Sequence, residues 1–273
     1  MKLKYYGTAA YEGFPALFCA CDGCKRARAA GGRNIRSRSQ ALINDELLID
    51  FPADTAMRFL YGDLPLPELR HCLITHKHSD HFYPMDVVAR CPVFAYPETE
   101  DPMHFYLPEN CEKELALRLS EQPDGGRVKL HTVKPFDVFN VAGIYTVTAL
   151  PAHHSAEAVF YMIEDGEKRI LYAHDTGSFL PEAQEFFKKE KPHFDFVSYD
   201  CTYGLDDNGS HHMGFPVVLR MDEMLRECGC IDCKTVRYVN HFSHNGKVTY
   251  DEMVPIAKKH GIGVAYDGLT VRI

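Results

Sequence analysis

A run of metal-binding side chains at 76–81 constrains this chain more than any other feature of its sequence. The apolar residues Cys72-Leu73-Ile74 predict the end of a buried strand, and His76-Lys77-His78-Ser79-Asp80-His81 follows almost at once. Side chains alternate along an extended strand, so His76 and His78 are expected to project to the same side. Asp80 and His81 fall where the chain must turn. The pattern predicts two adjacent divalent metal ions, ~3.5–4 Å apart, that activate a water molecule for hydrolysis.

The composition is that of a globular protein and sets limits on its partners. With 273 residues, of which 45% are hydrophobic, residues 1–273 suit a single domain without a linker or internal repeat. The net charge of −8 argues against a nucleic-acid partner. The N-terminal residues lack the apolar core of a signal peptide, and no apolar run approaches the ~20 residues of a membrane span. We therefore expect a cytoplasmic protein with no membrane partner, and these features leave a homodimer open.

Ten cysteines without an export signal favour thiols and metal sites over disulfides. Cys19, Cys21 and Cys24 have the spacing C-x-C-x-x-C, which brings three thiolates within reach of one tetrahedral zinc ion. We therefore expect a zinc-binding loop at about 18–38, with the fourth ligand supplied from elsewhere. The alternative is three reduced cysteines in a loop. The same spacing recurs in a second triplet made of Cys228, Cys230 and Cys233, which could recruit the fourth ligand equally well.

Hydrophobic patterning and turn residues predict alternating strands and helices along the whole chain. We expect strands at 2–6, 41–50 (a hairpin with its turn at Asn44-Asp45), 93–96, 128–133, 144–150, 158–163, 169–173, 194–201, 235–239 and, as a closing hairpin, 264–273. We expect helices at 53–60, 109–121 (ended by Pro123-Asp124-Gly125-Gly126), 213–227 and from a capping box of Thr249 and Glu252 to about 260.

The H-x-H-x-D-H string resembles the signature of the metallo-β-lactamase superfamily. That resemblance implies an α/β fold, the αββα four-layer sandwich with two mixed β-sheets flanked by helices. Members add a histidine, an aspartate and a final histidine, each at the end of a later strand, and His154, Asp175 and His241 match this order. In related sequences an aromatic residue stands seven positions after the first of these ligands, as Tyr161 does after His154, which favours His154 over its neighbour His153. The implied ligands are His76, His78 and His154 on one metal, Asp80, His81 and His241 on the other, and Asp175 as a bridge.

Finer features resemble one branch of this superfamily, the phosphoribosyl cyclic phosphate phosphodiesterases of phosphonate catabolism. The features are the early C-x-C-x-x-C, the closing H-x-S-H and a terminal Asp-Gly turn. The resemblance implies a structural zinc ion bound by Cys19, Cys21, Cys24 and His244. It also implies a substrate-facing histidine that best matches His212, with His211 as a close rival. The second triplet departs from the family pattern, so its role stays open.

A histidine at the start of the helix expected at 213–227 could bind an anionic substrate oxygen or protonate a leaving group. The alternative without a catalytic role is an imidazole that caps the helix or is exposed to solvent. We assign catalytic roles to His212 and to Asp80, which could steer the proton of the nucleophile as well as bind metal. We expect two active-site ions, with Zn, Mn and Fe all compatible with mixed nitrogen and oxygen ligands, and one structural Zn.

The ligand set and the resemblance together lead to a phosphodiesterase that opens a cyclic phosphate of the phosphoribosyl type by attack of metal-bound hydroxide on a small phosphoester substrate. An RNase Z-like tRNA-processing nuclease shares these ligands but needs a basic substrate arm, which the negative charge argues against. Another metal-dependent hydrolase, or an oxygenase with a single iron, remains an alternative on the same fold. A β-lactamase would carry an export signal, and a non-enzymatic relative would have lost ligands.

Overall fold

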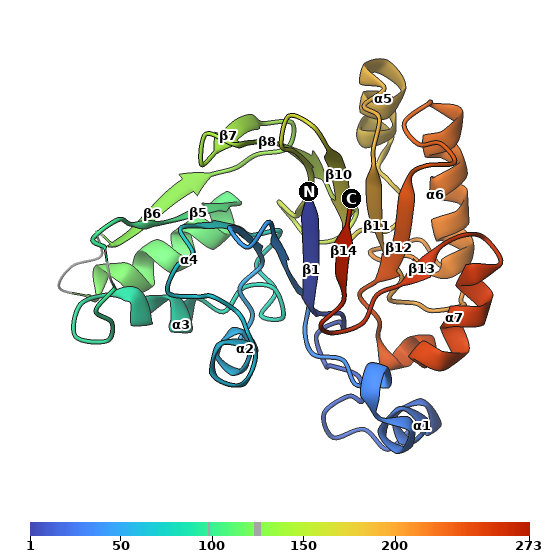
Figure 1. Ribbon diagram of the computed structural model, residues 1–273, viewed down its shortest axis with the longest axis horizontal. Coiled ribbons are helices and arrows are strands. Elements are labelled where there is room, and N and C mark those ends of the chain that lie inside the picture. The colour runs from blue at the N-terminus through green and yellow to red at the C-terminus, as the bar shows by residue number, and fades with distance from the viewer. Residues whose placement is uncertain (98, 123–126) are drawn as a thin grey trace.

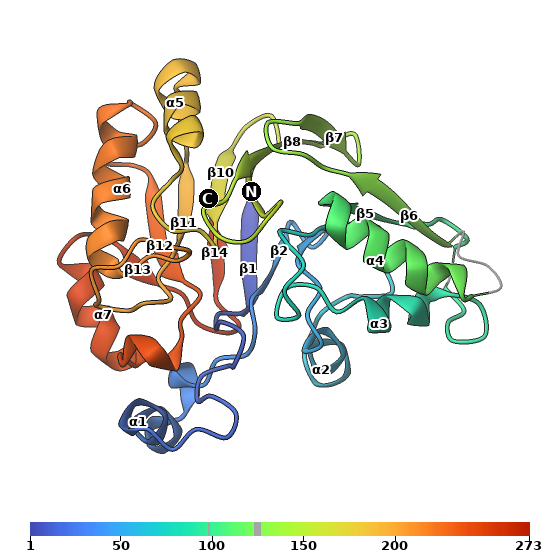
Figure 2. The same ribbon diagram turned by 180° about the vertical axis from the view of Figure 1, so that it is seen from behind.

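The computed structural model describes residues 1–97, 99–122 and 127–273, which form two facing β-sheets with helices on both outer faces (Figures 1 and 2). The first sheet has the order β14 (Thr270–Arg272), β1 (Lys2–Gly7), β2 (Gln40–Ile43), β3 (Leu47–Ile49), β4 (His71–Leu73), β5 (Met103–Leu107) and β6 (Val128–Thr132). The second has the order β13 (Gly263–Val264), β12 (Val236–Asn240), β11 (Phe196–Asp200), β10 (Arg169–Ala173), β9 (Val159–Glu164), β8 (Tyr145–Pro151) and β7 (Val138–Val141). The predicted αββα sandwich is confirmed.

The helices cover the two sheets in separate groups, and one helix stands apart from both groups (Figure 1). The first sheet is covered by α2 (Thr55–Tyr61), α3 (Pro84–Val87) and α4 (Glu109–Ser120), and the second by α5 (Pro181–Glu190), α6 (Phe215–Glu227) and α7 (Tyr250–Lys258). The separate helix is α1 (Asp22–Ala30), and the short 3-10 helices are η1 (Gly32–Asn34), η2 (Val88–Arg90) and η4 (His244–Gly246). Among the described residues, no helix combines the length and the apolar character needed to cross a membrane.

Three apolar layers hold the sandwich together. The central layer lies between the sheets and contains the fully buried rings of Tyr5, Tyr161 and Tyr172. Outer layers pack the first sheet against α3 and α4, and the second sheet against α5, α6 and α7. Strand β10 has buried side chains on both of its faces, so residues 170–173 form a continuous apolar run in the sequence.

The strand directions bring several strand ends to one edge of the molecule. Strands β3 to β6 run parallel to one another, and β10 to β13 do the same. Strand β8 is antiparallel to β9, which is antiparallel to β10, so β8 and β10 share a direction. The carboxyl ends of β3, β4, β8, β10, β11 and β12 can therefore present side chains to a common site, as open α/β sheets do.

Two predicted elements are wrong. Residues 92–94 form a turn rather than part of a strand at 93–96, and Val93 has a positive φ of 79°. Val93, Phe94 and Tyr96 are all exposed, and in the described part of the chain no strand pairs with this segment. The segment 264–273 is not a hairpin, because β13 pairs with β12 in the second sheet whereas β14 pairs with β1 in the first. The turn at Asp267-Gly268 carries the chain between the sheets.

The predicted helices are present with shifted boundaries. Helix α6 begins at Phe215 after the cap Gly214, because Pro216 suits only the first turn, so His211 and His212 lie in the preceding loop and do not open the helix. The capping box of Thr249 and Glu252 is confirmed. The segment 18–38 is not a plain loop, since it contains α1 and η1. The predicted helix end at 123–126 lies outside the described residues.

Candidate metal centre

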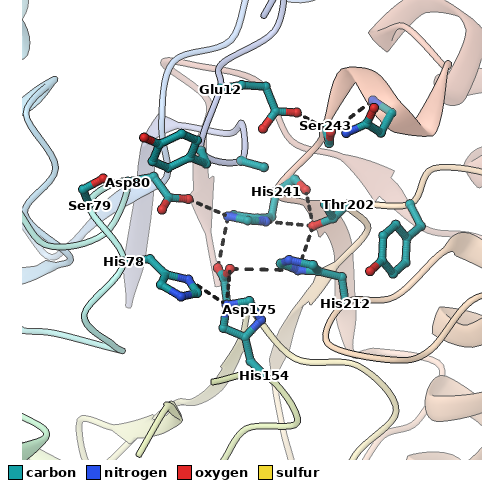
Figure 3. Close-up of a pocket in the computed structure, with 14 residues that line it drawn as sticks. Glu12, His78, Ser79, Asp80, His154, Asp175, Thr202, His212, His241 and Ser243 are labelled. Carbon is teal, nitrogen blue, oxygen red and sulfur yellow. Dashed lines mark hydrogen bonds and ion pairs between the residues drawn. The ribbon is translucent and has the colours of Figure 1, made fainter. Parts of the chain in front are cut away.

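The structure brings together the seven side chains predicted to bind the catalytic metals. Figure 3 shows five of them, His78, Asp80, His154, Asp175 and His241, around the cavity. The seven lie at the carboxyl ends of β4, β8, β10 and β12, beside a cavity of about 410 Å³. The ligand atoms fall into two groups. The first contains His76, His78 and His154, and the second contains Asp80, His81, Asp175 and His241.

In the first group three imidazole nitrogens face one another. Nδ1 of His78 lies 3.0 Å from Nε2 of His76 and 3.0 Å from Nε2 of His154. Burial lowers the pKa of His76 well below its usual range, so this imidazole is neutral and its Nε2 carries a lone pair. Burial likewise lowers the pKa of His154 to about 4. Three neutral imidazoles that converge in this way form a suitable site for a divalent cation.

His154 joins this group and His153 does not. The Nε2 atom of His154 is 3.6 Å from Oδ1 of Asp175, and its Nδ1 atom donates a hydrogen bond to the backbone oxygen of His211 at 3.0 Å. The ring of His153 instead lies beside the ring of His211, with 5.9 Å between centroids. The geometry therefore favours the histidine that the aromatic spacing indicated.

In the second group Asp175 supplies an oxygen to each half of the centre. Its Oδ2 atom lies 2.8 Å from Nε2 of His81 and 3.0 Å from Nε2 of His241, while Oδ1 faces His154 and His76. Burial would raise the pKa of Asp175, but the nearby imidazoles of His241 and His81 hold it well below its usual range. Oδ2 is buried and makes no hydrogen bond to the described residues. A buried anionic oxygen without a donor is costly, and a bound cation would remove that cost.

A second set of side chains fixes which nitrogen His76 and His81 offer. Nδ1 of His81 donates to Oδ2 of Asp50 at 2.6 Å, and Nδ1 of His76 donates to the hydroxyl of Thr75 at 3.0 Å. Thr75 in turn donates to Oδ1 of Asp50 at 2.9 Å. Each partner occupies Nδ1, so Nε2 is the nitrogen that His76 and His81 direct toward the centre, where a cation would take the place of any proton on it. The donor set therefore fits two divalent ions held mainly by imidazole and carboxylate groups.

Thr202 has the same function for the last histidine. Its hydroxyl donates to the backbone oxygen of His241 and accepts from Nδ1 of that ring, both at 2.8 Å. Sequence reasoning missed Asp50, Thr75 and Thr202. Asp50 and Thr202 closely follow β3 and β11, and Thr75 follows β4, so their positions just after parallel strands were the available signal.

Replacing Asp50 by asparagine is expected to weaken metal binding by roughly 10–100-fold, the usual effect of losing the partner of a ligating histidine. The amide has one oxygen for the three donors that Asp50 accepts from Thr75 and His81, and it no longer supplies the charge that favours the Nδ1–H form of His81. Competition with a fluorescent chelator measures the affinity. Asp45→Asn is a matched control, because Asp45 is exposed on the turn of the same hairpin. Equal affinities in the two variants would contradict this role for Asp50.

His212 faces the cavity from the loop before α6 and is paired with Asp200. Nδ1 of His212 lies 2.9 Å from Oδ2 of Asp200. Burial opposes the charged form of the imidazole, but the Asp200 carboxylate outweighs it and raises the pKa of His212 to about 9. His211 is exposed, and its Nδ1 donates to the backbone oxygen of His154 at 2.9 Å. Of the two rivals, His212 lines the cavity and His211 does not.

Asp200 and His212 could also form a metal group with Asp175 and His241, but the hydrogen bonds argue against it. Oδ1 of Asp200 accepts from the backbone N–H groups of Thr202 and Met213, and Oδ2 accepts from that of Asp175 and from His212. Both oxygens are thus occupied by donors within the protein. Asp200 holds and charges His212, and no sequence signal except its place at the end of β11 marked it.

A separate cluster gathers Cys19, Cys21, Cys24 and His244 at the N-terminus of α1. Nδ1 of His244 lies 3.4 Å from Sγ of Cys19 and 3.6 Å from Sγ of Cys21. The hydrogen bond from His244 lowers the pKa of Cys21 to about 6, which favours its thiolate. Three sulfur atoms and one imidazole nitrogen fit a tetrahedral zinc ion.

The three cysteines of the second triplet do not form a cluster. Cys228 donates to the sulfur of Met224, and Cys230 donates to the backbone oxygen of Phe187, while Cys233 is exposed. These cysteines follow the end of α6, and their side chains have separate neighbours. The same C-x-C-x-x-C spacing therefore forms a cluster in the first segment and not in the second. His244 accordingly lies with the first triplet.

Comparison with known proteins agrees with the fold. Residues 50–265 match the beta-lactamase superfamily domain, and the chain belongs to that superfamily. In solved structures its fold resembles a diphosphatase from the PhnP family, with a TM-score of 0.74, 19% identity and coverage of 99% of this chain and 96% of the other. It also resembles zinc-bound PqqB from Methylobacterium extorquens (TM-score 0.69, 18% identity, all of both chains).

The sequence is also similar to ribonuclease Z. It is 31% identical to the enzyme from Thermosynechococcus vestitus and 30% identical to that from Acaryochloris marina, each over 124 residues. These matches cover 44% of this chain but only 30% and 38% of the two enzymes. The chain therefore shares a segment, and not the full length, with these relatives.

Proposed function

We propose that this protein is a dinuclear metal-dependent hydrolase that opens a five-membered cyclic phosphate on a ribose unit. The observation that carries the proposal is the placement of His212, a half-buried imidazolium held by Asp200, on the cavity that the two metal groups line. Hydrolysis of a phosphodiester needs a nucleophile, stabilisation of charge on the phosphoryl oxygens and a proton for the leaving oxygen. The cavity offers residues for each of these tasks.

The two groups of ligands would hold the two ions, with Asp175 shared between them. When bound, such a pair activates water and neutralises charge on a phosphoryl group. Asp80 lines the cavity, and although burial opposes its ionisation, nearby His81 lowers its pKa, so it is a carboxylate. That carboxylate can accept a hydrogen bond from the attacking water and orient it toward phosphorus.

His212 supplies the acid. Because its Nδ1 is bound to Asp200, Nε2 is the nitrogen left for the substrate. Nε2–H can first stabilise a phosphoryl oxygen and then donate its proton to the departing sugar oxygen. In a five-membered cyclic ester that oxygen stays attached to the product, so the expected product is one ribose monoester.

The test is turnover of ribose 1,2-cyclic phosphate by manganese-loaded protein, with the reaction stopped by excess chelator and read by phosphorus NMR. The expected result is conversion to a single monoester, with kcat lowered roughly 10²–10⁴-fold in His212→Ala. His211→Ala is the matched control, because this neighbouring ring is exposed, and we expect it to stay near the wild-type rate. No turnover by protein with both metals bound would contradict the proposal.

A tRNA 3′-processing activity is the second candidate, and the 30–31% identity to ribonuclease Z favours it. Against it stands the net charge of −8, since tRNA binding depends on basic residues that neutralise phosphates. Incubation with a precursor tRNA settles the choice. We expect no cleavage and no gel shift, and endonucleolytic cleavage at the 3′ end would replace the cyclic-ester proposal.

A further inference from the structure

The carboxylate of Glu12 forms part of the cavity wall, and the proposed chemistry does not use it. Glu12 lies in the loop after β1, and Figure 3 shows it on the opposite side of the cavity from His154. Its Oε1 accepts a hydrogen bond from the hydroxyl of Ser243 and lies 3.6 Å from Nε2 of His244. In the described part of the chain, no hydrogen-bond donor reaches its Oε2.

A purely structural role accounts for only one of the two oxygens. His244 belongs to the cysteine cluster through Nδ1, and a carboxylate beside Nε2 would orient that ring for zinc. This explains Oε1. The second oxygen has no such partner, and the Glu12 side chain lines the cavity and is 23% exposed. An acceptor in this position is available to a ligand.

The charges of the side chains around the cavity determine which substrate groups can bind next to Glu12. Among the described residues that line the cavity none is lysine or arginine, whereas Glu12, Asp80 and Asp175 are acidic. Positive charge comes from His212 and from the ions that the two ligand groups would hold. These lie beside the reacting phosphate, so a second phosphate near Glu12 would meet a carboxylate that no lysine or arginine of the described cavity lining offsets. Contact between like charges is strongly unfavourable, whereas a hydroxyl group can donate to a carboxylate oxygen.

We propose that Glu12 selects the substrate by accepting a hydrogen bond from a free sugar hydroxyl and by excluding a second phosphate. The substrate class is thus a cyclic phosphodiester with one phosphate and an unphosphorylated sugar end, and this assignment rests on the phosphodiesterase function proposed above. The loop that carries Glu12 also packs against the cysteine cluster through Ser243 and His244, so the zinc site holds the selecting carboxylate in place.

The experiment compares ribose 1,2-cyclic phosphate that has a free C5 hydroxyl with the same ester phosphorylated at C5. The wild-type protein is expected to favour the free hydroxyl by about tenfold or more in kcat/KM. Glu12→Gln removes the charge but keeps an acceptor, so the preference should fall toward parity because the phosphorylated ester improves. Glu12→Asp keeps the charge and should keep the preference. Glu68→Gln, on an exposed segment before β4, is the control and should match the wild type.

Two further measurements make each outcome decisive. Zinc per chain is determined in every variant, because a structural role alone would change zinc content without changing the ratio of the two substrates. Calorimetry compares the binding of ribose 1-phosphate and ribose 1,5-bisphosphate, with the same tenfold preference for the monophosphate expected, and lost in Glu12→Gln. If neither cyclic ester is turned over, the proposed function is wrong. The ratio of the affinities for ribose 1-phosphate and ribose 1,5-bisphosphate still tests the role of Glu12. A preference for the doubly phosphorylated ligands, or a preference unchanged in Glu12→Gln with zinc retained, would overturn the role of Glu12.

Discussion

Replacing Asp175 by asparagine is expected to lower kcat at least ~10³-fold, equivalent to about 4 kcal/mol of transition-state stabilisation. Asp175 directs Oδ2 at His81 and His241 and Oδ1 at His154, so it serves both halves of the centre. Asparagine keeps the shape but has one oxygen and one amide group, and it has no charge to offer two cations. The NH₂ group would point at ligand atoms of one group and block its cation.

The measurement combines steady-state kinetics with metal content and a thermal melt. We expect fewer than two active-site ions per chain and a folded protein, since Asp175 sits at a strand end and the apolar layers do not depend on it. Asp207→Asn changes an exposed carboxylate before α6 and serves as the control. Normal turnover in Asp175→Asn would contradict the two-metal account.

Replacing Cys24 by serine is expected to remove one zinc ion per chain and to destabilise the N-terminal segment. Cys24 is fully buried in a small apolar cluster with Ala9, Phe14 and Ala27, so its sulfur holds the first turn of α1 against the loop before it. Structural zinc contributes free energy directly to folding. A loss of about 3 kcal/mol would lower Tm by roughly 6–12 °C in a chain of this size.

Cys233→Ser is the matched control. It alters the last cysteine of the second triplet, whose three cysteines have the same spacing but do not form a cluster. Zinc is counted by elemental analysis, and Tm is measured by calorimetry. We expect zinc content and Tm close to wild type in the control. Zinc loss in Cys233→Ser but not in Cys24→Ser would reverse the assignment of the two triplets.

The sequence was most informative where the metal ligands lie close together along the chain. His76, His78, Asp80 and His81 lie within six residues of one loop directly after β4, so their spacing alone places them together. Asp50, Asp200 and Thr202 were missed because each is an ordinary polar residue near a strand end. Their contacts depend on pairing between strands that are far apart in the chain, and periodicity carries no record of that pairing.

The two wrong elements have related causes. The segment 93–96 has strand-forming side chains, but no neighbouring strand accepts it, and β propensity depends on such packing. The segment 264–273 looks like a hairpin locally, but its two halves complete different sheets. His212 shows a third case. Its position was indicated by a resemblance, while the reason offered, a helix N-terminus, was wrong, because the charge on the ring is set by Asp200.

The most direct test of the central claim, a two-metal centre beside a separate zinc site, is a crystal structure of zinc-loaded protein with anomalous scattering data. We expect three zinc peaks in each chain. Two would lie roughly 3.5–4 Å apart, one among His76, His78 and His154 and one among Asp80, His81 and His241, with Asp175 between them. The third would lie between Cys19, Cys21, Cys24 and His244. A single peak in the cavity, or a peak bound by Asp200 and His212, would contradict the account.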